Sequence, residues 1–513
     1  MNIYWLNPPI STRSLYCDLA WINFSFILKD HTWIPPIVNW DDYQTIDDVI
    51  NDVLKQPVDI LCISNYIWNN RLCAEVAKKI KQINPNIIVI SGGPNQFDVP
   101  EYVDYMCYTM GHGEIFLIEL FKQLSKHKKV IAPDFIPYLV TKNYVSPITK
   151  GKYEFPSESP FEYNSDYIID VVQQAKLANK SVSIPYETTR GCPYSCTYCE
   201  WGAGGTSAKL SQKPIETILA DIELFAMLGV KELDIIDANF GILKRDVTIV
   251  NKIKECKEKY GYPKRVLLFG LTKNSRKNKE AILDVLFEGE LIDNYFMAIQ
   301  SISKEALDNV KRIDIELEEN LELSDKYKKL YNTCTKVELI MGLPGSTLED
   351  FYNEMDLFQR TNDWFYPRNM LTLLPGTEAY TSEYREKHKL KTVMVGTMEN
   401  EEQDVFYISN SVINQYKSSF ELVIESYSFT KEDFKEMFFM NRAQRILGPM
   451  VKYKASIELK QAFDKIKKMD WYKVIDEWTT KLINGELENK EISVIDGKLI
   501  EDIVDENIKS LDI

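Results

Sequence analysis

The feature that most limits how this chain can fold is a regular alternation of short apolar runs with amphipathic stretches. Residues 59–64 (DILCIS) and 87–91 (IIVIS) are apolar almost throughout, and residues 71–83 between them repeat apolar positions at helical spacing. Strands that are apolar on both faces are typical of parallel sheets covered by helices. With residues 2–6 and 105–109 they predict one parallel sheet, whose ligands would bind beyond the carboxyl ends of its strands.

A second series of strands and helices runs from residue 182 to about residue 381. Helices are expected between the strands, for example over residues 215–228 and 348–360. The predicted strands cover residues 183–188, 232–237, 265–269, 294–299, 336–341 and 366–373. Six successive βα units favour a complete or partial barrel, with its chemistry at the carboxyl ends of the strands.

These two series predict an α/β protein of three domains. The length of 513 residues fits this number, because a domain typically holds roughly 150 residues. We expect a Rossmann-like parallel sheet over residues 1–135, a connector over 136–181, a partial (β/α)6 barrel over 182–384 and a mainly helical domain over 385–513. The helical domain is expected to cap the barrel and to help form the substrate pocket.

Composition narrows the class of protein further. A net charge of −15 counts against a protein that coats nucleic acid. The sequence has only four histidines, which counts against a metal site built from several histidines. The first residues, MNIYWLNPPI, do not resemble a signal peptide, and no run of about 18 apolar residues suggests a membrane span. The chain is therefore expected to be cytoplasmic, where clustered cysteines act as metal ligands or catalytic groups rather than as disulfides.

Three of the nine cysteines lie within eight residues, directly after the first strand of the second series. Cys192, Cys196 and Cys199 have the spacing C-x3-C-x2-C. Three thiolates can hold three irons of a [4Fe–4S] cluster and leave the fourth iron open. A structural zinc site is the alternative, but such a site normally takes four ligands in two pairs, and no second pair is present. Chance clustering is the remaining alternative.

The segment Cys-x3-Cys-x-Tyr-Cys at the first strand of a six-unit βα series resembles the radical S-adenosylmethionine (radical SAM) enzymes. The resemblance covers about residues 182–380. It implies that the open iron binds the amino and carboxylate groups of SAM, and that reductive cleavage yields a 5′-deoxyadenosyl radical. An external electron donor such as flavodoxin or ferredoxin would supply the electron.

The same resemblance implies SAM contacts at the ends of the later strands. Asp237 and Asn239 stand where the family often has Gly-Gly-Glu, and either could accept a hydrogen bond from the SAM amine. For both of them, capping of the next helix is the structural alternative. The full set of predicted SAM residues is Tyr198, Asp237, Asn239, Thr272, Gln300, Ser301, Gly342, Leu343 and Pro344. Tyr198 could instead simply pack beside the cluster.

Two glycine turns in the first sheet are similar to those of the cobalamin-binding domain that precedes the barrel in one radical SAM subfamily. Glycine lets a backbone approach a ligand closely. The predicted cobalamin residues in these turns are Ser91, Gly92, Gly93, Pro94, Gly111, His112, Gly113 and Glu114. A flavodoxin-like domain with another ligand, or with none, is the alternative interpretation.

The Asp-x-His-x-x-Gly motif, whose histidine coordinates cobalt in other cobalamin proteins, is absent from the sequence. We therefore predict that cobalamin binds without a histidine as its lower ligand. Asn65, Tyr66 and Trp68 follow the apolar strand at residues 59–64 and are predicted to face the lower side of the cobalt. Their structural alternative is a helix start with core aromatic residues.

The cysteine motif continues as Cys199-Glu200-Trp201-Gly202. This extension resembles the Cys-Asp-Trp-Gly of the cobalamin-dependent group that includes carbapenem-tailoring methyltransferases. The resemblance implies a C-methyltransferase that uses the radical and methylcobalamin to methylate an unactivated carbon. Rearrangement, ring contraction, cyclisation or oxidation with the same cofactors is one alternative, and a non-catalytic sensor of SAM or cobalamin is another. A small-molecule or peptide substrate is expected, with no membrane and no nucleic acid as partner.

Overall fold

The chain divides into two compact units in the computed structural model. The first consists of Met1–Tyr194, Glu200–Ile292 and Phe406–Ser418, and the second of Ser195–Cys199, Asp293–Val405 and Ser419–Ile513. The structure describes residues 1–9, 12–94, 99–108, 111–146, 153–202, 209–273, 275–333, 335–360, 364–365, 369–396, 412, 419–447 and 480.

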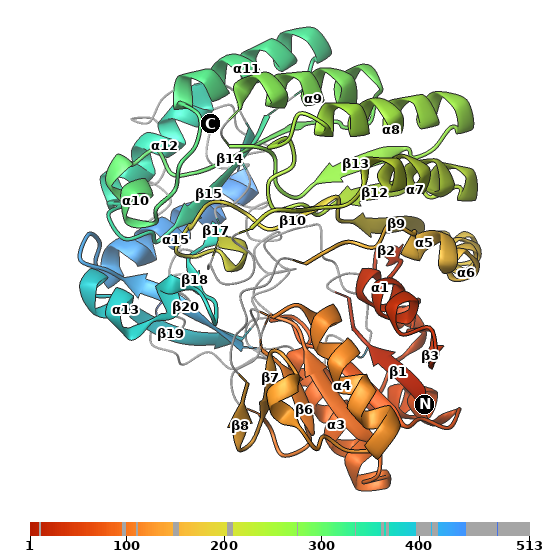
Figure 1. Cartoon of the computed structure of the whole chain (residues 1–513). Coiled ribbons are helices and arrows are strands. Elements are labelled where there is room, and N and C mark those ends of the chain that lie inside the picture. The colour runs from red at the N-terminus through yellow and green to blue at the C-terminus, as the bar shows by residue number, and fades with distance from the viewer. Residues whose placement is uncertain are drawn as a thin grey trace. The chain divides into compact units, whose positions relative to one another are not determined.

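A seven-stranded sheet forms the N-terminal part of the first unit (Figure 1). Its order is β3 (Thr32–Ile34), β1 (Asn2–Leu6), β4 (Ile60–Ser64), β5 (Ile88–Gly92), β6 (Tyr105–Cys107), β7 (Leu139–Thr141) and β8 (Tyr144–Val145). The first five strands are parallel, and β7 and β8 are antiparallel additions at one edge. The predicted parallel sheet is confirmed, and it extends past residue 135 into the expected connector.

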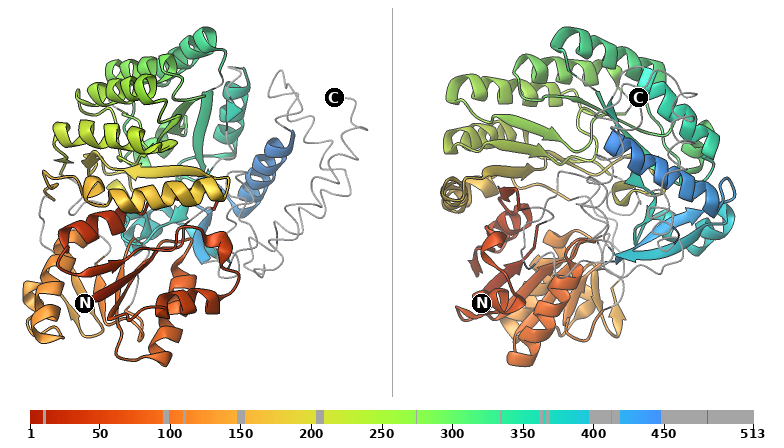
Figure 2. Two further views of the ribbon diagram at one scale, coloured as in Figure 1. Left: turned by 90° about the vertical axis from the view of Figure 1, so that its right-hand side faces the viewer. Right: turned by 180° about the vertical axis from the view of Figure 1, so that it is seen from behind.

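Helices cover both faces of this sheet, as its uniformly apolar strands require (Figures 1 and 2). In β1, Ile3 and Trp5 belong to one core cluster, while Tyr4 and Leu6 belong to another. The first cluster includes residues of α1 (Leu19–Ile27) and α4 (Gly113–His127), and the second includes residues of α2 (Ile46–Leu54) and α3 (Asn70–Ile83). Successive side chains of a strand point to opposite faces, so one short strand serves both cores.

A four-stranded parallel sheet forms the rest of the first unit. Its order is β13 (Arg265–Leu268), β12 (Glu232–Ile235), β9 (Ser181–Tyr186) and β2 (Ser14–Tyr16). Helices α7 (Ile215–Leu228), α8 (Asp246–Tyr260) and α9 (Arg276–Glu288) follow its strands, and α5 (Pro160–Tyr163) and α6 (Ser165–Leu177) precede β9. The strands predicted near residues 183, 232 and 265 are confirmed, but the pairing of β2 with β9 was not predicted.

The second unit continues the strand–helix alternation. Strands β14 (Tyr295–Gln300), β15 (Thr335–Met341) and β16 (Trp364–Phe365) are parallel, and β17 (Asn369–Met370) also pairs with β15. Helices α10 (Lys304–Asn309), α11 (Leu317–Tyr331) and α12 (Leu348–Arg360) lie between them in the sequence. The strand predicted at residues 366–373 is present as β17 and β18 (Thr372–Leu373), and residues 366–368 lie outside the described part of the chain.

The C-terminal part combines helices with an antiparallel sheet. Helices α13 (Ser382–His388) and α15 (Lys431–Leu447) agree with the predicted helical character, whereas β19 (Lys391–Gly396) and β20 (Ser419–Glu425) were not predicted. These strands form the order β18-β20-β19. Both contain β-branched residues, which favour extended backbone, in a segment otherwise rich in lysine. Most of residues 448–513 lie outside the described part.

The surface of the described chain gives no sign of a transmembrane helix. No helix among the described residues is long and apolar enough to cross a membrane.

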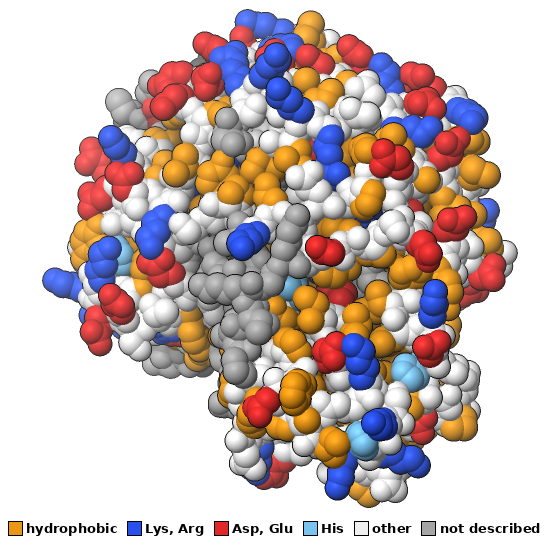
Figure 3. Space-filling model, viewed as in Figure 1, with side chains coloured by type: hydrophobic (Ala, Val, Ile, Leu, Met, Phe, Trp, Pro, Cys, Tyr) orange, Lys and Arg blue, Asp and Glu red, His pale blue; other side chains and the backbone are white. Residues whose placement is uncertain are grey.

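On the face shown in Figure 3, acidic and basic side chains are interspersed rather than gathered by sign.

Candidate functional site

The cysteine loop follows β9, and a short antiparallel strand pair connects its start to the chain that follows it. Residues Thr189 and Arg190 form β10, which pairs antiparallel with β11 (Ser211–Gln212). Gly191 then has a φ of 99°, a backbone conformation that residues with a Cβ rarely adopt. Gly191 therefore turns the chain from β10 into the loop, directly before Cys192.

The three thiols are the donor set that a [4Fe–4S] cluster takes. Cys192 and Cys196 are buried, and Cys199 is partly exposed. Cys192 belongs to the first compact unit and the other two cysteines to the second. Within the described ranges, no three His, Cys, Asp or Glu side chains are gathered as a metal-binding group.

In the second unit, the turn after α10 holds the later half of the loop. The amide of Thr197 donates to the carbonyl of Val310 at 3.1 Å, and Arg312 Nη1 donates to the hydroxyl of Tyr198 at 3.1 Å. Arg312 is buried and also donates to the carbonyl of Ala298 and, at 2.7 Å, to Asp314. Arg312 carries no motif in the sequence, and our sequence analysis did not identify it as part of the site.

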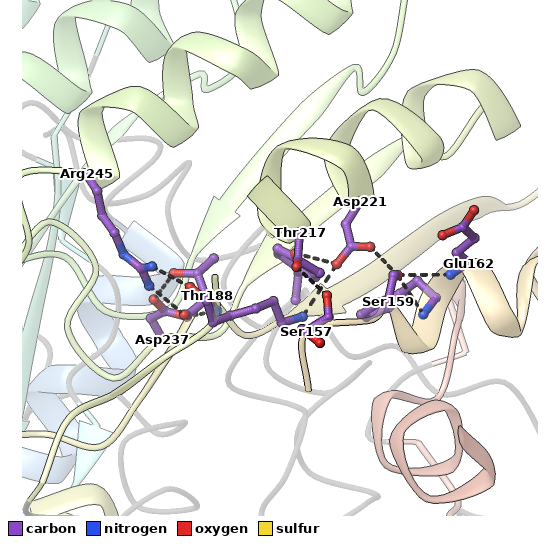
Figure 4. Close-up of polar contacts among 11 residues, drawn as sticks. Ser157, Ser159, Glu162, Thr188, Thr217, Asp221, Asp237 and Arg245 are labelled. Carbon is purple, nitrogen blue, oxygen red and sulfur yellow. Dashed lines mark hydrogen bonds and ion pairs between the residues drawn. The ribbon is translucent and has the colours of Figure 1, made fainter. Parts of the chain in front are cut away.

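The first polar residue after β12, Asp237, is bound within the fold. It accepts hydrogen bonds from the amide and hydroxyl of Thr188, at 2.7 and 2.5 Å, so both of its oxygens are occupied (Figure 4). Arg245 donates to the Thr188 carbonyl at 2.9 Å and completes this connection between β9 and α8. Burial raises the pKa of Asp237 to about 7, although the bonds from Thr188 oppose the shift.

Asn239, two residues later, is also buried but differs from Asp237 in its hydrogen bonding. Its side chain is 3% exposed, yet neither its amide nitrogen nor its amide oxygen has a hydrogen-bond partner among the described residues. Buried amides are normally hydrogen-bonded, so an unsatisfied amide at a strand end indicates a ligand position. Of the two residues that the sequence left as alternatives, the geometry favours Asn239.

Thr272 lies beside the same turn. The backbone of Phe240 bonds to Gly270 and Thr272, both at 2.7 Å. Gly241 has a φ of 95°, and a Cβ there would lie 3.0 Å from the Thr272 side chain. The structure therefore places Thr272 against the turn that carries Asn239.

The predicted SAM residues of the second unit differ in whether the fold already uses their side chains. Gln300 adopts a φ of 69°, which is strained for a residue with a side chain and typical of functional positions. The hydroxyl of Ser301 instead donates to the buried Glu354 at 2.6 Å. Ser301 therefore fixes the turn after β14, and Glu354 is a second residue that the sequence did not reveal.

The turn after β15 contains the remaining predicted SAM residues. Gly342 has a φ of 87°, and no atom lies closer than 3.6 Å to the position of a Cβ there. Leu343 is fully buried, and the carbonyl of Pro344 accepts from Asn309 at 3.1 Å. A Cβ on Gly342 would make ordinary van der Waals contacts with Val423, Phe429 and Leu371, so this position is packed rather than open.

At the carboxyl end of the N-terminal sheet, the structure brings Asn65, Ser91, Gly92 and Gly93 together. The side-chain amide of Asn65 donates to the Ser91 hydroxyl, and its backbone amide donates to the Gly92 carbonyl, both at 2.7 Å. A Cβ on Gly93 would lie 2.4 Å from the Asn65 carbonyl oxygen, whereas one on Gly92 would meet nothing within 4 Å. Pro94 follows directly and is partly buried.

Tyr66 and Trp68 stack beside this edge, with ring centroids 4.3 Å apart and an angle of 12° between the ring planes. Burial raises the pKa of Tyr66 to about 12. The buried indole nitrogen of Trp68 has no hydrogen-bond partner in the described part of the chain. The stacked pair is a flat aromatic surface on the loop that follows β4.

The second glycine turn, Gly111-His112-Gly113-Glu114, is packed tightly at the start of α4. A Cβ on Gly111 would lie 2.6 Å from the Tyr138 side chain, and one on Gly113 would lie 3.1 Å from Phe24. The buried His112 ring contacts Tyr138 and Tyr153. Glu114 accepts two hydrogen bonds from Arg190, another residue that the sequence analysis did not identify.

Comparison with known proteins identifies the class. Residues 186–358 match the family model of the Radical SAM superfamily. The chain therefore contains a radical SAM domain, as the cysteine motif predicted.

Particular relatives agree with the subgroup that the cysteine extension predicted. The chain is 30% identical over 410 residues to the cobalamin-dependent radical SAM methyltransferase TokK of Streptomyces tokunonensis, covering 77% of this chain and 57% of that protein. It is 31% identical over 307 residues to the 2-(S-pantetheinyl)-carbapenam-3-carboxylate methyltransferase of Streptantibioticus cattleyicolor, covering 57% of this chain and 44% of the relative. The chain thus spans about half the length of these relatives.

Solved structures share the fold. The radical SAM methyltransferase TsrM of Kitasatospora setae superposes with a TM-score of 0.61 at 16% identity, over 86% of this chain and 89% of that one. The cobalamin-dependent SAM radical enzyme OxsB superposes with a TM-score of 0.58 at 13% identity, over 99% of this chain and 75% of that one. The predicted α/β architecture is confirmed.

Proposed function

We propose that this protein is a cobalamin-dependent radical SAM methyltransferase that methylates an unactivated carbon atom. The observation that carries the proposal is the presence, in one chain, of the three-cysteine loop after β9 and of a glycine turn with an open position at Gly92, at the carboxyl edge of a preceding parallel sheet. The relatives named above, which are cobalamin-dependent or carbapenam methyltransferases, support it.

When bound, a [4Fe–4S] cluster with SAM would supply a 5′-deoxyadenosyl radical, and cobalamin would supply the methyl group. The chain's own residues bind, orient and shield these groups. Cys192, Cys196 and Cys199 would hold three irons. Arg312 fixes the hydroxyl of Tyr198 between the last two cysteines, which restricts the orientation of that ring.

SAM would lie along the strand ends, where Asn239 offers a buried amide that the fold does not use. Its oxygen can accept from the SAM amine, and its nitrogen can donate to an acceptor on the ligand. Gln300, Gly342, Leu343, Pro344, Thr272 and Tyr198 stay in the proposed set. Asp237 and Ser301 would act indirectly, because their side chains are bound to Thr188 and Glu354.

Cobalamin would lie over Gly92, with Tyr66 and Trp68 toward its lower face and no histidine ligand on the cobalt. The stacked rings offer an apolar surface rather than a basic nitrogen, because an indole nitrogen is a donor only. Electron paramagnetic resonance of reduced, cobalamin-loaded protein should then lack nitrogen superhyperfine coupling. Such coupling would contradict this arrangement.

The proposed partners are a small-molecule or peptide substrate and an external one-electron donor such as a flavodoxin or ferredoxin. The helical and antiparallel C-terminal part is proposed to contribute to the substrate pocket.

The proposal is tested first by anaerobic reconstitution with iron, sulfide and cobalamin. We expect about four irons per chain and a cobalamin absorption band. Replacing Cys192, Cys196 and Cys199 by Ala should abolish iron binding. Cys256→Ala is the matched control, because Cys256 is buried within α8 away from the loop and should not affect the iron content.

The reaction itself is tested with methyl-labelled SAM and the cognate substrate. Methyl transfer adds one CH2 to the mass of the product and carries the label. A product without label would refute methyl transfer, and a product of unchanged carbon count would indicate rearrangement, ring contraction, cyclisation or oxidation instead.

A further inference from the structure

The guanidinium of Arg190 is held between two carboxylates within the first compact unit. Its Nη1 and Nη2 donate to the two oxygens of Glu114, at 3.0 and 2.9 Å. Its Nε and Nη2 donate to Glu187, at 3.0 and 2.7 Å for the shorter contacts. This is a bidentate, charge-assisted arrangement, the strongest geometry in which arginine binds a carboxylate.

Aromatic rings cover the same guanidinium. Its central carbon lies 4.1 Å from the ring centroid of Tyr153 and 5.5 Å from that of Phe155. The side chain of Arg190 is 21% exposed and that of Glu114 only 8%. Low exposure strengthens each ion contact and makes an uncompensated charge costly, so the side chain of Arg190 has one well-determined position.

The backbone of Arg190 is fixed as well. It pairs with Ser211 in β10 and β11, and the left-handed Gly191 follows it directly. Cys192 is therefore separated by one glycine from a residue whose backbone and side chain are both restrained. The position from which the cysteine loop departs depends on Glu114, which lies in the first turn of α4 on the N-terminal sheet.

This geometry gives Glu114 a different task from the one that the sequence suggested. Both of its oxygens are directed at Arg190, so they are not available to a ligand over the glycine turn. We propose that Glu114 and Arg190 are a pair of positioning residues that fix the start of the cluster loop relative to the Gly111–Glu114 turn, and that Glu114 is not a direct cobalamin contact.

The inference rests on the proposed function only in naming the two cofactors. The restraint itself concerns the chain's own residues and can be measured without either cofactor. Since the pair joins the two motifs, we expect a change at the glycine turn to reach the cysteine loop through this ion pair and through Tyr153, which contacts both His112 and Arg190.

Three variants test the pair. Glu114→Gln removes the charge of the carboxylate, Arg190→Lys keeps the positive charge but removes the bidentate guanidinium contact, and the third variant combines both changes. Hydrogen exchange of the amides of residues 187–192 is measured in full-length protein without iron or cobalamin. We expect both single variants to accelerate this exchange about tenfold or more, and the double variant to be no faster than the faster single variant, because the two residues act as one unit.

A matched pair elsewhere serves as control. Arg385 makes the same two-pronged contact with Glu421 in the second unit, at similar side-chain exposure. Glu421→Gln and Arg385→Lys should leave the exchange of residues 187–192 at the wild-type rate. If the control variants accelerate it equally, the effect is general loosening and the proposal fails.

A second readout is the electron paramagnetic resonance spectrum of the reduced cluster in iron-loaded, cobalamin-free protein. We expect Glu114→Gln and Arg190→Lys to shift the spectrum in the same way. If Glu114→Gln keeps wild-type exchange and spectrum but loses cobalamin binding, Glu114 is a cobalamin contact and the proposal is overturned.

Glu114→Asp covers the case in which the charge-neutral variant does not fold. It keeps the charge with a shorter reach, and an intermediate exchange rate is expected; a wild-type rate would count against the pair. If the wild-type protein itself takes up no cobalamin, the proposed function fails, while the exchange test still decides the role of Glu114 and Arg190.

Discussion

At the scale of single residues, Asp237 and Asn239 show how neighbours in sequence separate in role. Both are buried and both follow β12. Asp237 uses its two oxygens to bind Thr188, whereas Asn239 has an amide without a partner among the described residues. Sequence placed both at the site because each offers an oxygen at a strand end, and only the hydrogen-bond arrangement distinguishes them.

Asn239→Ala is therefore expected to weaken SAM binding without a matching loss of hydrogen bonds in the fold. A lost hydrogen bond to a charged group corresponds to roughly 1.5–3 kcal/mol, or about a tenfold to hundredfold weaker affinity. Equilibrium SAM binding to cluster-loaded protein measures the effect. Wild-type affinity in the variant would show that Asn239 does not contact SAM.

Asn164→Ala is the matched control for this prediction. Asn164 is an equally buried amide, but its nitrogen donates to the carbonyls of Ile22 and Pro160, at 3.0 and 2.9 Å. Removing it leaves those carbonyls without this donor and should lower the melting temperature, with unchanged SAM affinity in the folded protein.

Asp237 predicts a pH dependence of stability. Its pKa in the folded protein is raised by burial from 3.8 to about 7. Between these values the unfolded chain releases the proton while the folded chain keeps it, so this group makes folding less favourable as pH rises. Asp237→Asn keeps an acceptor for the Thr188 amide and removes the titration.

The difference in melting temperature between about pH 5 and about pH 8 should thus be smaller in Asp237→Asn than in wild type. Asp47→Asn is the control, because the Asp47 side chain is 75% exposed and should leave the wild-type pH dependence in place. An equal pH dependence in wild type and Asp237→Asn would contradict the raised pKa.

At the scale of elements, the turn after β5 assigns different tasks to two adjacent glycines. Gly93 has a φ of 101° and lies against the Asn65 backbone, whereas the position of a Cβ on Gly92 is open. Gly93→Ala should destabilise the ligand-free protein by roughly 1–3 kcal/mol, because the strain is in the fold itself. Gly92→Ala should retain wild-type stability.

Cobalamin binding should respond differently in the two variants. A methyl group on Gly92 would project into the space where we propose the corrin lies, so Gly92→Ala should bind cobalamin more weakly despite its normal melting temperature. Absorbance titration with cobalamin measures this. Full cobalamin affinity in Gly92→Ala would place the ligand elsewhere.

The elements that sequence predicted well are those whose pattern is local. Strands β1, β4 and β5 are short, largely apolar runs, so they could be placed from the sequence alone. The pairing of β2 with β9 could not, because three residues carry too little pattern to show a partner so distant in sequence. Strands β19 and β20 were missed for a similar reason, since charged residues surround their β-branched positions.

The candidate site divides in the same way. The cysteines could be identified because their spacing is itself the signal. Arg190, Arg312 and Glu354 could not, because a buried charge is recognised by its partners, which come from distant segments. Arg190 lies two residues before the first cysteine of the motif, and this position was the one available hint.

At the scale of the whole first unit, the core does not follow the predicted domain boundaries. One apolar cluster contains Ile3 and Trp5 of the N-terminal sheet together with Ile184 and Leu233 of β9 and β12. Helix α6 packs against both β2 and β9, and it lies in the segment predicted as a connector. A continuous core of this kind predicts that the two sheets of the unit unfold together.

Leu15→Ala tests this cooperativity. Leu15 lies in β2, is 1% exposed and belongs to the shared cluster. Such a substitution typically destabilises a core by roughly 2–5 kcal/mol. We expect native-state hydrogen exchange to show a similar loss of protection in β1, β9 and β12, although β1 belongs to the other sheet of the unit.

Leu323→Ala is the control for this last prediction. Leu323 is fully buried in α11 of the second unit, so its loss removes a comparable apolar contact without touching the shared cluster. It should leave the protection of β9 and β12 unchanged. If Leu15→Ala loosens only β2, β9 and β12 and leaves β1 with wild-type protection, the N-terminal sheet is a separate folding unit, and the shared core is too weak to couple the proposed cobalamin and radical SAM regions.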